Sequence, residues 1–268
     1  MNAPGNTIGS MRTPALGYLL SLMNYPNKAP EIMQMDARII NGTETTENEF
    51  PYQIALMAET NGGPSYYCGA FLISSRYAVT AAHCVDSPLA FSVRVGSLYH
   101  SRGGEKRLVD SAMKHPLYDP ESNDFDVAVL LLAPPELAFS RYVQPAQLAS
   151  AESDARANEL GVATGWGTIN PKTDTPSNTL MKVNLPILSR EECEGAYGAA
   201  ITARMLCAGY FDGRHDACQG DSGGPLAVGG KVVGVVSWGY GCAQEGCPGV
   251  YTSISSVRQW IREVTDGV

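Results

Sequence analysis

The sequence predicts an all-β fold in which two antiparallel β-barrels pack together and are followed by a C-terminal α-helix. From residue 50 onward, short apolar or alternating runs recur between turn residues, as the strands of such barrels do. The 268 residues include 28 glycines and 17 prolines, which suits a chain with many turns. Helical periodicity is found only near the C-terminus, so we expect a mostly β protein.

Each half of the chain supplies its own strands. In the first half, the candidate strands span residues 52–58, 69–74, 77–81, 91–96 and 126–132. In the second half, they span residues 160–165, 179–185, 205–208, 224–228, 231–238 and 249–253. Prolines and turn residues between 134 and 145 predict the linker, which puts barrel one at about residues 39–140 and barrel two at about 141–255.

The end of the chain predicts one helix over about residues 256–266. Its apolar residues recur at the spacing of a single helix face: Val257, Trp260, Ile261 and Val264. Ser255 and Ser256 are candidate N-cap residues, because a serine oxygen can accept a hydrogen bond from an unpaired backbone N–H. We therefore expect this helix to dock on the barrels by its apolar face.

The first 38 residues lie outside the predicted barrels. An apolar run over residues 16–23 follows Arg12 and predicts the core of a signal peptide, with Met11 as an alternative start. Residues 24–38 show little periodicity and predict a propeptide. The alternative is a structured N-terminal helix, which three prolines disfavour: Pro14, Pro26 and Pro30.

Composition limits the partners of the protein. The formal net charge of −8 and the pI near 5.0 argue against nucleic acid and anionic membranes. No apolar run is long enough to span a bilayer. Hydrophobic residues make up 44% of the chain and charged residues 17%, as in a globular rather than a disordered protein. We expect a monomer that needs no cofactor.

Residues 216–225 form the densest group of reactive and turn-forming residues in the chain. Ser222 stands between Asp221 and Gly223, and Gly220 lies just before them. A serine hydroxyl is a poor nucleophile unless a base takes its proton and backbone donors receive the oxyanion. Glycines suit that task, because a backbone without Cβ can turn sharply and approach a substrate. A plain glycine-rich turn beside a disulfide is the alternative.

His83 and Asp126 supply the partners that Ser222 needs. His83 lies in the sequence Thr-Ala-Ala-His-Cys, and Asp126 opens an apolar run. Asp124 competes with Asp126 for the same role, but the apolar run directly follows Asp126. The order His, Asp, Ser and these local sequences resemble the chymotrypsin/trypsin family of serine proteases. The resemblance covers the chain from residue 39 to its end.

The resemblance implies two six-stranded antiparallel barrels of the trypsin type and a division of chemical roles. Ser222 would attack the peptide carbonyl, and His83 would take its proton and pass it to the leaving amine. Asp126 would hold the imidazole in the required tautomer. The backbone N–H groups of Gly220 and Ser222 would form the oxyanion hole. We expect the remaining histidines to be solvated: His100, His115 and His215.

The resemblance also implies a substrate pocket. Asp216 would form its floor, where a buried carboxylate needs a cationic partner. Gly239 and Gly249 would line its walls and leave room for a long side chain. A surface loop acid is the alternative interpretation of Asp216. The resemblance therefore implies cleavage of protein or peptide substrates after Arg or Lys, and protein protease inhibitors as further partners.

Ala217 refines the expected specificity. A serine beside Asp216 would help to hold the compact ammonium of a lysine, whereas an arginine reaches the carboxylate directly. Because alanine gives no such help, we expect a preference for Arg over Lys. The remaining substrate-binding residues would pair with the substrate backbone as an added strand: Ser237, Trp238 and Gly239.

Arg38 and Ile39 match the activation site of the family. The resemblance implies that cleavage after Arg38 frees the amine of Ile39, which would then pair with the carboxylate of Asp221. Breaking a buried ion pair costs roughly 3–5 kcal/mol, which is enough to hold the Gly220 loop in place. An ordinary surface acid is the alternative for Asp221. Asn41 begins a formal N-glycosylation sequon close to this N-terminus.

Seven cysteines are many for a cytosolic enzyme, so we expect a secreted, extracellular protein. The spacing Cys-x-x-Cys, which would suggest zinc or a redox pair, does not occur. The resemblance implies three disulfides: Cys68–Cys84, Cys193–Cys207 and Cys218–Cys242. Cys247 is left over as a free thiol, an intermolecular disulfide or a rival partner for Cys218.

Two functional classes compete. The first is a secreted serine endopeptidase made as a zymogen, and the second is a catalytically silent homologue that serves as a binding or regulatory module. A silent homologue usually lacks one residue of the triad, whereas all three are present here, which favours the enzyme. In members of the chymotrypsin/trypsin family that bind calcium, the ion is held by spaced carboxylates in the loop between the His and Asp strands. Here that loop, residues 97–107, carries one acid among three cations. Calcium requires several oxygen ligands, so we expect no metal.

Overall fold

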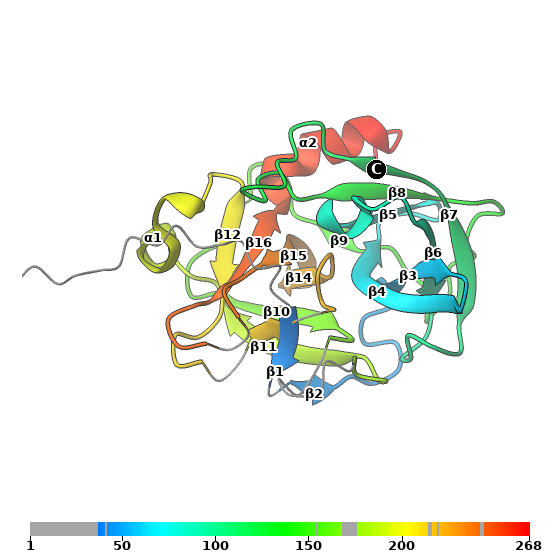
Figure 1. The fold of residues 1–268 in the computed structure, drawn as a ribbon, viewed down its shortest axis with the longest axis horizontal. Coiled ribbons are helices and arrows are strands. Elements are labelled where there is room, and N and C mark those ends of the chain that lie inside the picture. Colours follow the sequence, from blue (N-terminus) through cyan, green and yellow to red (C-terminus); the bar gives the residue numbers. More distant parts are fainter. Residues whose placement is uncertain are drawn as a thin grey trace, which may run out of the picture. The chain divides into compact units, whose positions relative to one another are not determined.

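The computed structural model describes residues 37–40, 42–153, 155–167, 176–213, 216–218, 220–241 and 244–268. A closed antiparallel barrel occupies the first half of the chain, with the strand order β3-β4-β5-β8-β7-β6 (Figure 1). Its strands are β3 (Gln53–Thr60), β4 (Gly63–Leu72), β5 (Tyr77–Thr80), β6 (Ala90–Val95), β7 (Glu105–Lys114) and β8 (Ala128–Leu132). The barrel interior is apolar, because alternate side chains of each strand point inward. Ile54, Leu56, Leu72 and Leu130 are fully buried there.

Six strands of the second half form the second sheet in the order β12-β16-β15-β14-β10-β11. They are β10 (Leu160–Gly165), β11 (Met181–Pro186), β12 (Met205–Ala208), β14 (Pro225–Val228), β15 (Lys231–Trp238) and β16 (Gly249–Ser253). An isolated bridge between Ile187 and Ala208 links the end of β11 back to β12. The Leu188 N–H also donates to the Cys207 carbonyl at 2.9 Å. The second half therefore also curls round on itself.

Four further short strands are present among the described residues: two attach to this sheet, and two form a separate pair. β2 (Thr43–Glu44) pairs with β11, and β9 (Gln147–Leu148) pairs with β15. The expected first barrel began at residue 39, yet β2 belongs to the second sheet. β1 (Ala37–Ile40) and β13 (Asp216–Cys218) form a separate antiparallel pair, in which Ile40 is opposite Asp216. The backbone around the expected activation bond thus lies beside the strand that begins at the expected pocket acid.

The all-β prediction is confirmed, and several strands begin and end where the sequence predicts. β10, β12, β15 and β16 match their predicted ranges. β7 is not among the predicted strands, because its ten residues are mostly exposed, half of them are charged, and they show no apolar alternation. β7 is nevertheless hydrogen-bonded on both sides, to β6 and to β8. Backbone pairing on both sides, with Val109 and Met113 packed against the core, keeps this polar strand in a closed barrel, where no edge is left open.

The C-terminal helix α2 (Ile254–Val264) starts two residues earlier than predicted. Its N-cap position is Ser253, so neither Ser255 nor Ser256 caps it. Val257 and Ile261 are buried as the periodicity predicts. No helix in the described parts of the chain is long and apolar enough to cross a membrane.

A second helix, α1 (Arg190–Tyr197), contradicts the expectation that only the C-terminus is helical. A capping box starts it: the Glu192 N–H donates to Ser189 Oγ at 3.2 Å, and the Ser189 N–H donates to the Glu192 carboxylate at 2.8 Å. Only Cys193 and Tyr197 are buried in it. Such a short helix with two apolar contacts leaves too little periodicity to be read from sequence. The described residues also contain two 3₁₀ turns, η1 (His83–Val85) and η2 (Gly198–Ala200).

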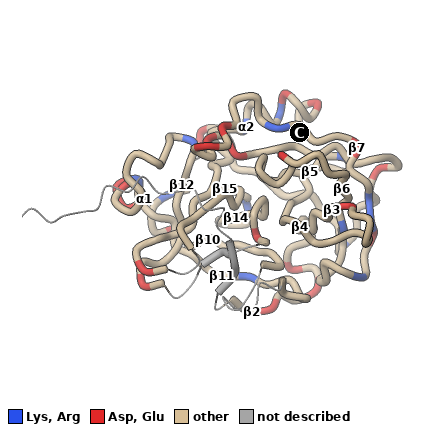
Figure 2. Tube along the Cα trace, in the orientation of Figure 1, with Lys and Arg blue, Asp and Glu red and all other residues tan. Residues whose placement is uncertain are grey.

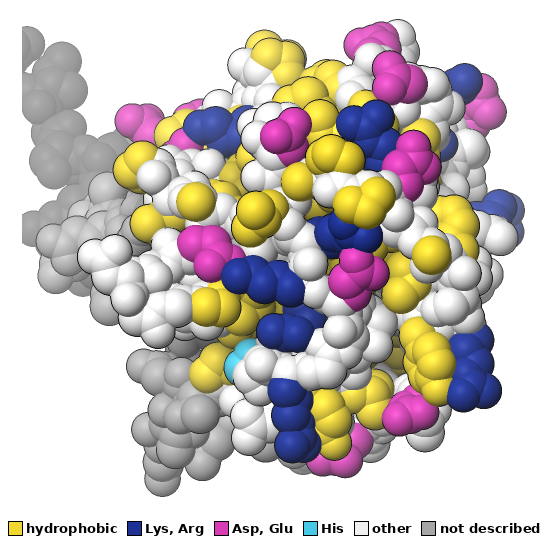
Figure 3. Space-filling view, turned by 90° about the vertical axis from the view of Figure 1, so that its right-hand side faces the viewer, with side chains coloured by type: hydrophobic (Ala, Val, Ile, Leu, Met, Phe, Trp, Pro, Cys, Tyr) yellow, Lys and Arg dark blue, Asp and Glu magenta, His cyan; other side chains and the backbone are white. Residues whose placement is uncertain are grey.

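Charged residues are spread along the described chain, many of them on loops (Figure 2). The face that carries β7 shows cations, anions and hydrophobic side chains interspersed (Figure 3). Lys106 of β7 forms an ion pair with Glu59 of β3 at 2.6 Å. Two aspartates are instead buried, Asp126 at 0% and Asp221 at 1% exposure. A buried carboxylate requires compensating donors, so both lead to the candidate site.

Candidate active site

His83 and Asp126 form a close pair within the first barrel. His83 follows β5 and opens η1, and a disulfide between Cys68 and Cys84 ties that turn to β4. The His83 backbone N–H donates to Asp126 Oδ1 at 2.9 Å, and His83 Nδ1 lies 2.7 Å from Asp126 Oδ2. The imidazole keeps 31% of its side-chain surface exposed. The pair therefore joins a buried carboxylate to a ring that a substrate can reach.

The second barrel also holds Asp126. Ser237, in β15, donates its hydroxyl to Asp126 Oδ2 at 2.6 Å. Thr252, in β16, donates its hydroxyl to the backbone carbonyl of Asp126 at 2.8 Å. Sequence reasoning assigned Ser237 to substrate binding and missed Thr252, because nothing in the local sequence of β16 points to a residue so distant in the chain. Asp126 is thus fixed from both halves of the molecule by neutral donors.

The charges of the pair support each other. Burial by itself lowers the pKa of His83, but the negative charge of Asp126 and its hydrogen bond raise that pKa above its ordinary value. Burial by itself raises the pKa of Asp126, but the contacts with His83 and Ser237 bring that pKa below its ordinary value. The carboxylate is therefore negative whenever the imidazole accepts a proton.

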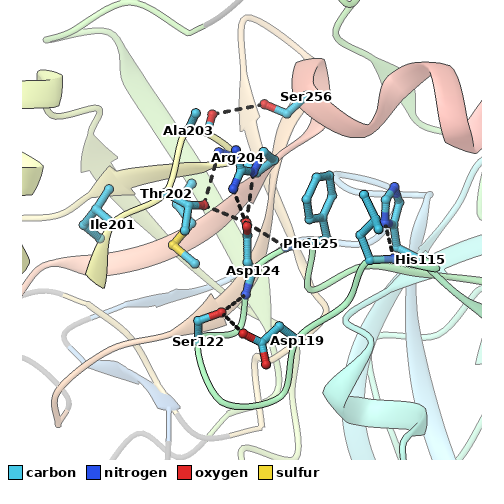
Figure 4. A network of polar contacts seen from close by, with 12 residues as sticks. His115, Asp119, Ser122, Asp124, Phe125, Ile201, Thr202, Ala203, Arg204 and Ser256 are labelled. Atoms are coloured by element: carbon cyan, nitrogen blue, oxygen red, sulfur yellow. Dashed lines mark hydrogen bonds and ion pairs between the residues drawn. The ribbon is translucent and has the colours of Figure 1, made fainter. Parts of the chain in front are cut away.

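Asp124 belongs to a different network (Figure 4). Arg204 donates from Nε to Asp124 Oδ1 at 3.1 Å and from its Nη2 group to Oδ2. Thr202 Oγ1 donates to Oδ1 at 2.7 Å. Burial by itself raises the pKa of Asp124, but the contacts with Arg204 and Thr202 bring that pKa below its ordinary value. Asp124 is thus paired with an arginine from the second half of the chain, and its charge is already compensated.

Phe125 separates the two aspartates and has a positive φ of 53°. A bulky residue in this region is strained, typically by about 1–3 kcal/mol, unless its surroundings hold it. Its ring stacks on His115 with centroids 4.4 Å apart, and the Arg204 guanidinium lies 4.9 Å above it. His115 also contacts Trp260 of α2 at 4.8 Å. This packing fixes the turn that directs Asp124 and Asp126 to different partners.

Two of the three other histidines depart from the expectation of solvated side chains. His115 is 8% exposed, because it lies between Phe125 and Trp260. His100 is half-buried against the ring of Tyr66, with centroids 5.0 Å apart. His215 lies outside the described residues. Aromatic stacking in a loop has no sequence period, so neither burial could be read from the pattern.

The loop that carries Ser222 reaches from the second barrel to the first. The Gly69 N–H of β4 donates to the Ser222 carbonyl at 2.8 Å. Cys84 Sγ lies 3.6 Å from that carbonyl oxygen and 3.7 Å from His83 Nε2. Ser222 and the imidazole therefore flank the same sulfur atom. The structure thus brings together the three residues that the sequence analysis selected.

Two glycines are required by the crowding around Ser222. A Cβ on Gly223 would lie 2.1 Å from Thr80 Oγ1, and its φ is +79°. Gly220 has φ +87°, a backbone conformation that L side chains rarely adopt. Glycine is therefore needed on both sides of the segment that holds Asp221 and Ser222.

Asp221 points away from the imidazole, into the second half. Its Oδ1 accepts a hydrogen bond from the Gly167 N–H at 2.9 Å. A Cβ on Gly165 would lie 2.0 Å from the same oxygen, so glycine is also required there. The carboxylate is buried among backbone groups and is not a surface acid. The side chains of Arg38 and Ile39 lie outside the described residues, so the expected ion pair stays a prediction.

The expected pocket is described in part. Gly239 follows β15, Gly249 begins β16, and a Cβ on Gly239 would lie 3.9 Å from the Gly249 Cα. Trp238, at the end of β15, contacts Tyr197 and Tyr240 with ring centroids 5.0 and 5.8 Å apart. For Asp216 and Ala217 the structure describes only the backbone, as part of β13. The assignment of Asp216 to the pocket floor therefore remains a prediction from the sequence. The two expected wall residues, Gly239 and Gly249, lie close to each other.

Two of the three implied disulfides are present, Cys68–Cys84 and Cys193–Cys207. The third, Cys218–Cys242, is not tested, because neither the Cys218 side chain nor Cys242 is among the described parts of the chain. Cys247 is half-buried and packs against the apolar cluster that includes Cys193 and Cys207. Cys68, His83 and Cys84 place three potential metal-ligand atoms within 4.8 Å, but both sulfurs are used in a disulfide. This group is therefore unsuited to a metal ion.

Comparison with known proteins gives consistent results. A sequence model described as "Trypsin" matches residues 39–261. Trypsin 5G1 of Aedes aegypti is 40% identical over 237 residues, which cover 87% of this chain and 87% of that protein. The trypsin of Simulium vittatum is 41% identical over 221 residues, covering 81% of this chain and 89% of that protein. Neuropsin, a serine protease expressed in the limbic system of mouse brain, has a solved structure that is similar with a TM-score of 0.77 and 34% identity. That match covers 85% of this chain and 100% of neuropsin.

Proposed function

Because the chain belongs to the trypsin family of serine proteases, we propose that it is a secreted endopeptidase that cleaves after Arg and Lys through His83, Asp126 and Ser222. The observation that carries this proposal is the His83–Asp126 pair, with Nδ1 and Oδ2 2.7 Å apart and the other ring nitrogen beside the Ser222 loop. A general base held by a buried carboxylate next to a serine is the arrangement that acyl transfer requires.

The residues would share the chemistry as follows. Ser222 Oγ attacks the scissile carbonyl carbon while its proton passes to His83 Nε2. The new Oγ–C bond gives a tetrahedral intermediate. The imidazolium, stabilised by Asp126, then gives this proton to the leaving amine as the C–N bond breaks. Water then attacks the acyl-enzyme by the same two steps, with His83 again taking and returning the proton. The carboxylic acid product leaves and Ser222 is regenerated. The N–H groups of Gly220 and Ser222 donate to the oxyanion at each stage.

Specificity for basic side chains rests on Asp216 at the start of β13. Gly239 and Gly249 support this assignment, because their Cα regions lie close together and carry no side chain that would fill the pocket. A carboxylate at the end of such a slot attracts a cationic side chain. The cation also pairs with a buried carboxylate that would otherwise have no counter-charge. Ala217 favours Arg over Lys, since a guanidinium reaches the carboxylate without help.

Activation by cleavage after Arg38 would couple the new N-terminus to Asp221. The pairing of β1 with β13 supports this proposal, because it keeps the backbone of residues 37–40 beside the pocket strand. Asp221 is buried and lies next to Ser222, so an ammonium that reaches it would be held strongly. The signal-like run over residues 16–23 and the disulfides support secretion.

Hydrolysis of a small arginyl ester tests the proposal directly. The secreted full-length chain, cut after Arg38, should hydrolyse the arginyl ester faster than the lysyl ester and leave an apolar ester nearly untouched. Ser222→Ala should abolish hydrolysis in the cut protein. Arg38→Gln should give a chain that resists activation and remains nearly inactive. Cut protein that hydrolyses none of the esters would instead indicate the silent binding homologue.

A further inference from the structure

Tyr66 contacts the loop that carries Ser222 but has no part in the proposed mechanism. It lies in β4, two residues before Cys68, and its hydroxyl donates to the carbonyl of Gly220. The two residues are 154 positions apart in the sequence and come from different halves of the chain. We propose that Tyr66 is a positioning residue: by holding the carbonyl of the Gly220–Asp221 peptide, it limits backbone rotation at Gly220 and keeps the Gly220 N–H directed at the oxyanion. This inference rests on the proposed function.

The backbone of residues 220–222 is held at each carbonyl in turn. The Gly224 N–H donates to the Asp221 carbonyl at 2.8 Å, and the Gly69 N–H donates to the Ser222 carbonyl at 2.8 Å. Tyr66 holds the first carbonyl of this series, that of Gly220. Backbone donors hold the other two, so the Gly220 anchor is the one that a side-chain substitution can remove.

Gly220 is the position at which such an anchor matters most. It has no Cβ and a φ of +87°, so its N–H can turn with little steric resistance of its own. The ring of Tyr66 adds a second restraint, because a Cβ on Gly220 would lie 3.1 Å from Tyr66 Cε1. The Gly220 N–H belongs to the preceding peptide, so its direction relative to the fixed carbonyl depends on φ and ψ of Gly220. The ring edge against the Cα restricts that rotation. Preorganised donors are what an oxyanion site requires.

The tyrosine is itself held in place. Its ring contacts Trp166 with centroids 6.0 Å apart and an interplanar angle of 70°, and it packs against His100 on another side. Trp166 is 1% exposed, and its indole N–H donates to the Leu98 carbonyl at 2.8 Å. A rigid aromatic support lets the hydroxyl transmit position, which a mobile side chain would not do.

The phenol stays a donor throughout the pH range in which His83 acts as a base. Burial, and after it the negative charge of Asp221, raise the pKa of Tyr66 well above its ordinary value. His100 and Trp166 contact Tyr66 through their rings. In these contacts neither residue accepts a hydrogen bond from the Tyr66 hydroxyl. The hydrogen bond to Gly220 therefore persists while the enzyme is active.

The variant Tyr66→Phe tests the role, since it removes one oxygen and keeps the ring. Tyr67→Phe is the matched control, because Tyr67 is the next residue of β4 and its ring contacts Phe91 instead. In the activated enzyme, Tyr66→Phe should lower kcat about tenfold with KM for an arginyl substrate unchanged. Tyr67→Phe should leave kcat as in the wild type.

Two inhibitors separate positioning from general damage. A peptidyl arginine aldehyde forms a tetrahedral adduct with the serine and uses the oxyanion site, whereas benzamidine occupies only the pocket. Tyr66→Phe should weaken the aldehyde by the same factor as kcat and leave benzamidine unchanged. Equal loss of both affinities, or kcat equal to that of the wild type, would overturn the role of Tyr66.

Acylation by p-nitrophenyl acetate distinguishes this inference from the proposed function. That ester needs the nucleophile and the oxyanion site but not the arginine pocket. If the wild-type enzyme is acylated but ignores arginyl substrates, the specificity proposal fails, and the Tyr66→Phe comparison is made with the acetate. If the wild-type enzyme is inert towards both esters, the protease function fails and the inference fails with it. An acylation rate in Tyr66→Phe equal to that of the wild type contradicts the inference alone.

Discussion

Asp124 and Asp126 lie two residues apart in one loop, yet the structure gives them opposite surroundings. Asp126 is completely buried and receives hydrogen bonds from His83 and Ser237. Asp124 keeps 15% of its side chain exposed and is paired with the guanidinium of Arg204. The difference shows that the partners of a carboxylate, more than its place in the sequence, decide what its charge can do.

The physical reason lies in the kind of donor. Arg204 carries a permanent positive charge, so the field of Asp124 is largely cancelled at the place where it arises. Ser237 is a neutral donor, so it holds Asp126 without cancelling its charge. The remaining charge raises the pKa of His83 and, in the proposed mechanism, would stabilise the imidazolium that forms during proton transfer. Asp124 is suited to fastening the loop, and Asp126 to the chemistry.

Asp126→Asn should produce the largest effect. An amide facing His83 Nδ1 donates where the carboxylate accepted, which leaves Nε2 protonated and unable to take the proton of Ser222. We expect kcat to fall by about 10⁴-fold, with the protein still folded. Because the charge of Asp126 raises the pKa of His83, its loss should also move the acid limb of the residual activity to lower pH. Steady-state rates between pH 5 and pH 9 measure both changes, and an unshifted limb would contradict the electrostatic role.

Asp124→Asn should have the opposite profile, with stability lost and catalysis largely kept. The amide leaves Arg204 without its ionic partner, which we expect to lower the free energy of unfolding by about 1–3 kcal/mol. Since Asp126 keeps its own donors, kcat should change less than tenfold. Denaturant unfolding and steady-state kinetics on the same preparation check the pair. A loss of kcat comparable with that of Asp126→Asn would erase the distinction between the two aspartates.

Acid pH sharpens this result, because the folded-state pKa of Asp124 lies below its ordinary value. A carboxyl with a depressed folded pKa stabilises the fold above its unfolded pKa, about 3.9, and loses that contribution as the pH falls through the folded value. The stability gap between the wild type and Asp124→Asn should therefore be constant near neutral pH and close below about pH 4. A gap that stays constant into acid would mean that the charge of Asp124 is irrelevant.

The contrast between the aspartates also shows how far the sequence could lead. Local motifs selected His83, Asp126 and Ser222, and strand patterns predicted β10 and β15 to the residue, because both signals are short-range. Arg204 and Tyr66 have no such signal. Arg204 joins Asp124 across 80 residues, and Tyr66 joins Gly220 across 154, so only the folded chain reveals them. One sequence gives no information on which distant side chains meet.

Ser237→Ala should weaken Asp126 without disabling it. The change removes the donor at 2.6 Å from Oδ2, while His83 still binds both carboxylate oxygens. We expect kcat to fall about tenfold, the value of one hydrogen bond to a charged group. Ser177→Ala is a matched control, because that serine is also buried but donates to the Thr179 carbonyl. Measuring kcat of both variants side by side shows whether the loss comes from the missing hydrogen bond to Asp126. Equal losses of kcat in the two variants would contradict that origin.

Lys106→Gln should have the smallest effect and sets the lower end of the scale. Lys106 and Glu59 form an ion pair at 2.6 Å on the outer face of the first barrel, with 36% and 25% of their side chains exposed. Water screens such a pair, so its loss should change the free energy of unfolding by about 0–1 kcal/mol and leave kcat unchanged. Glu59 keeps a hydrogen bond from Ser92 in the variant. If Lys106→Gln destabilised the protein as much as Asp124→Asn in the same denaturant series, the burial of the Asp124–Arg204 pair would not explain its strength.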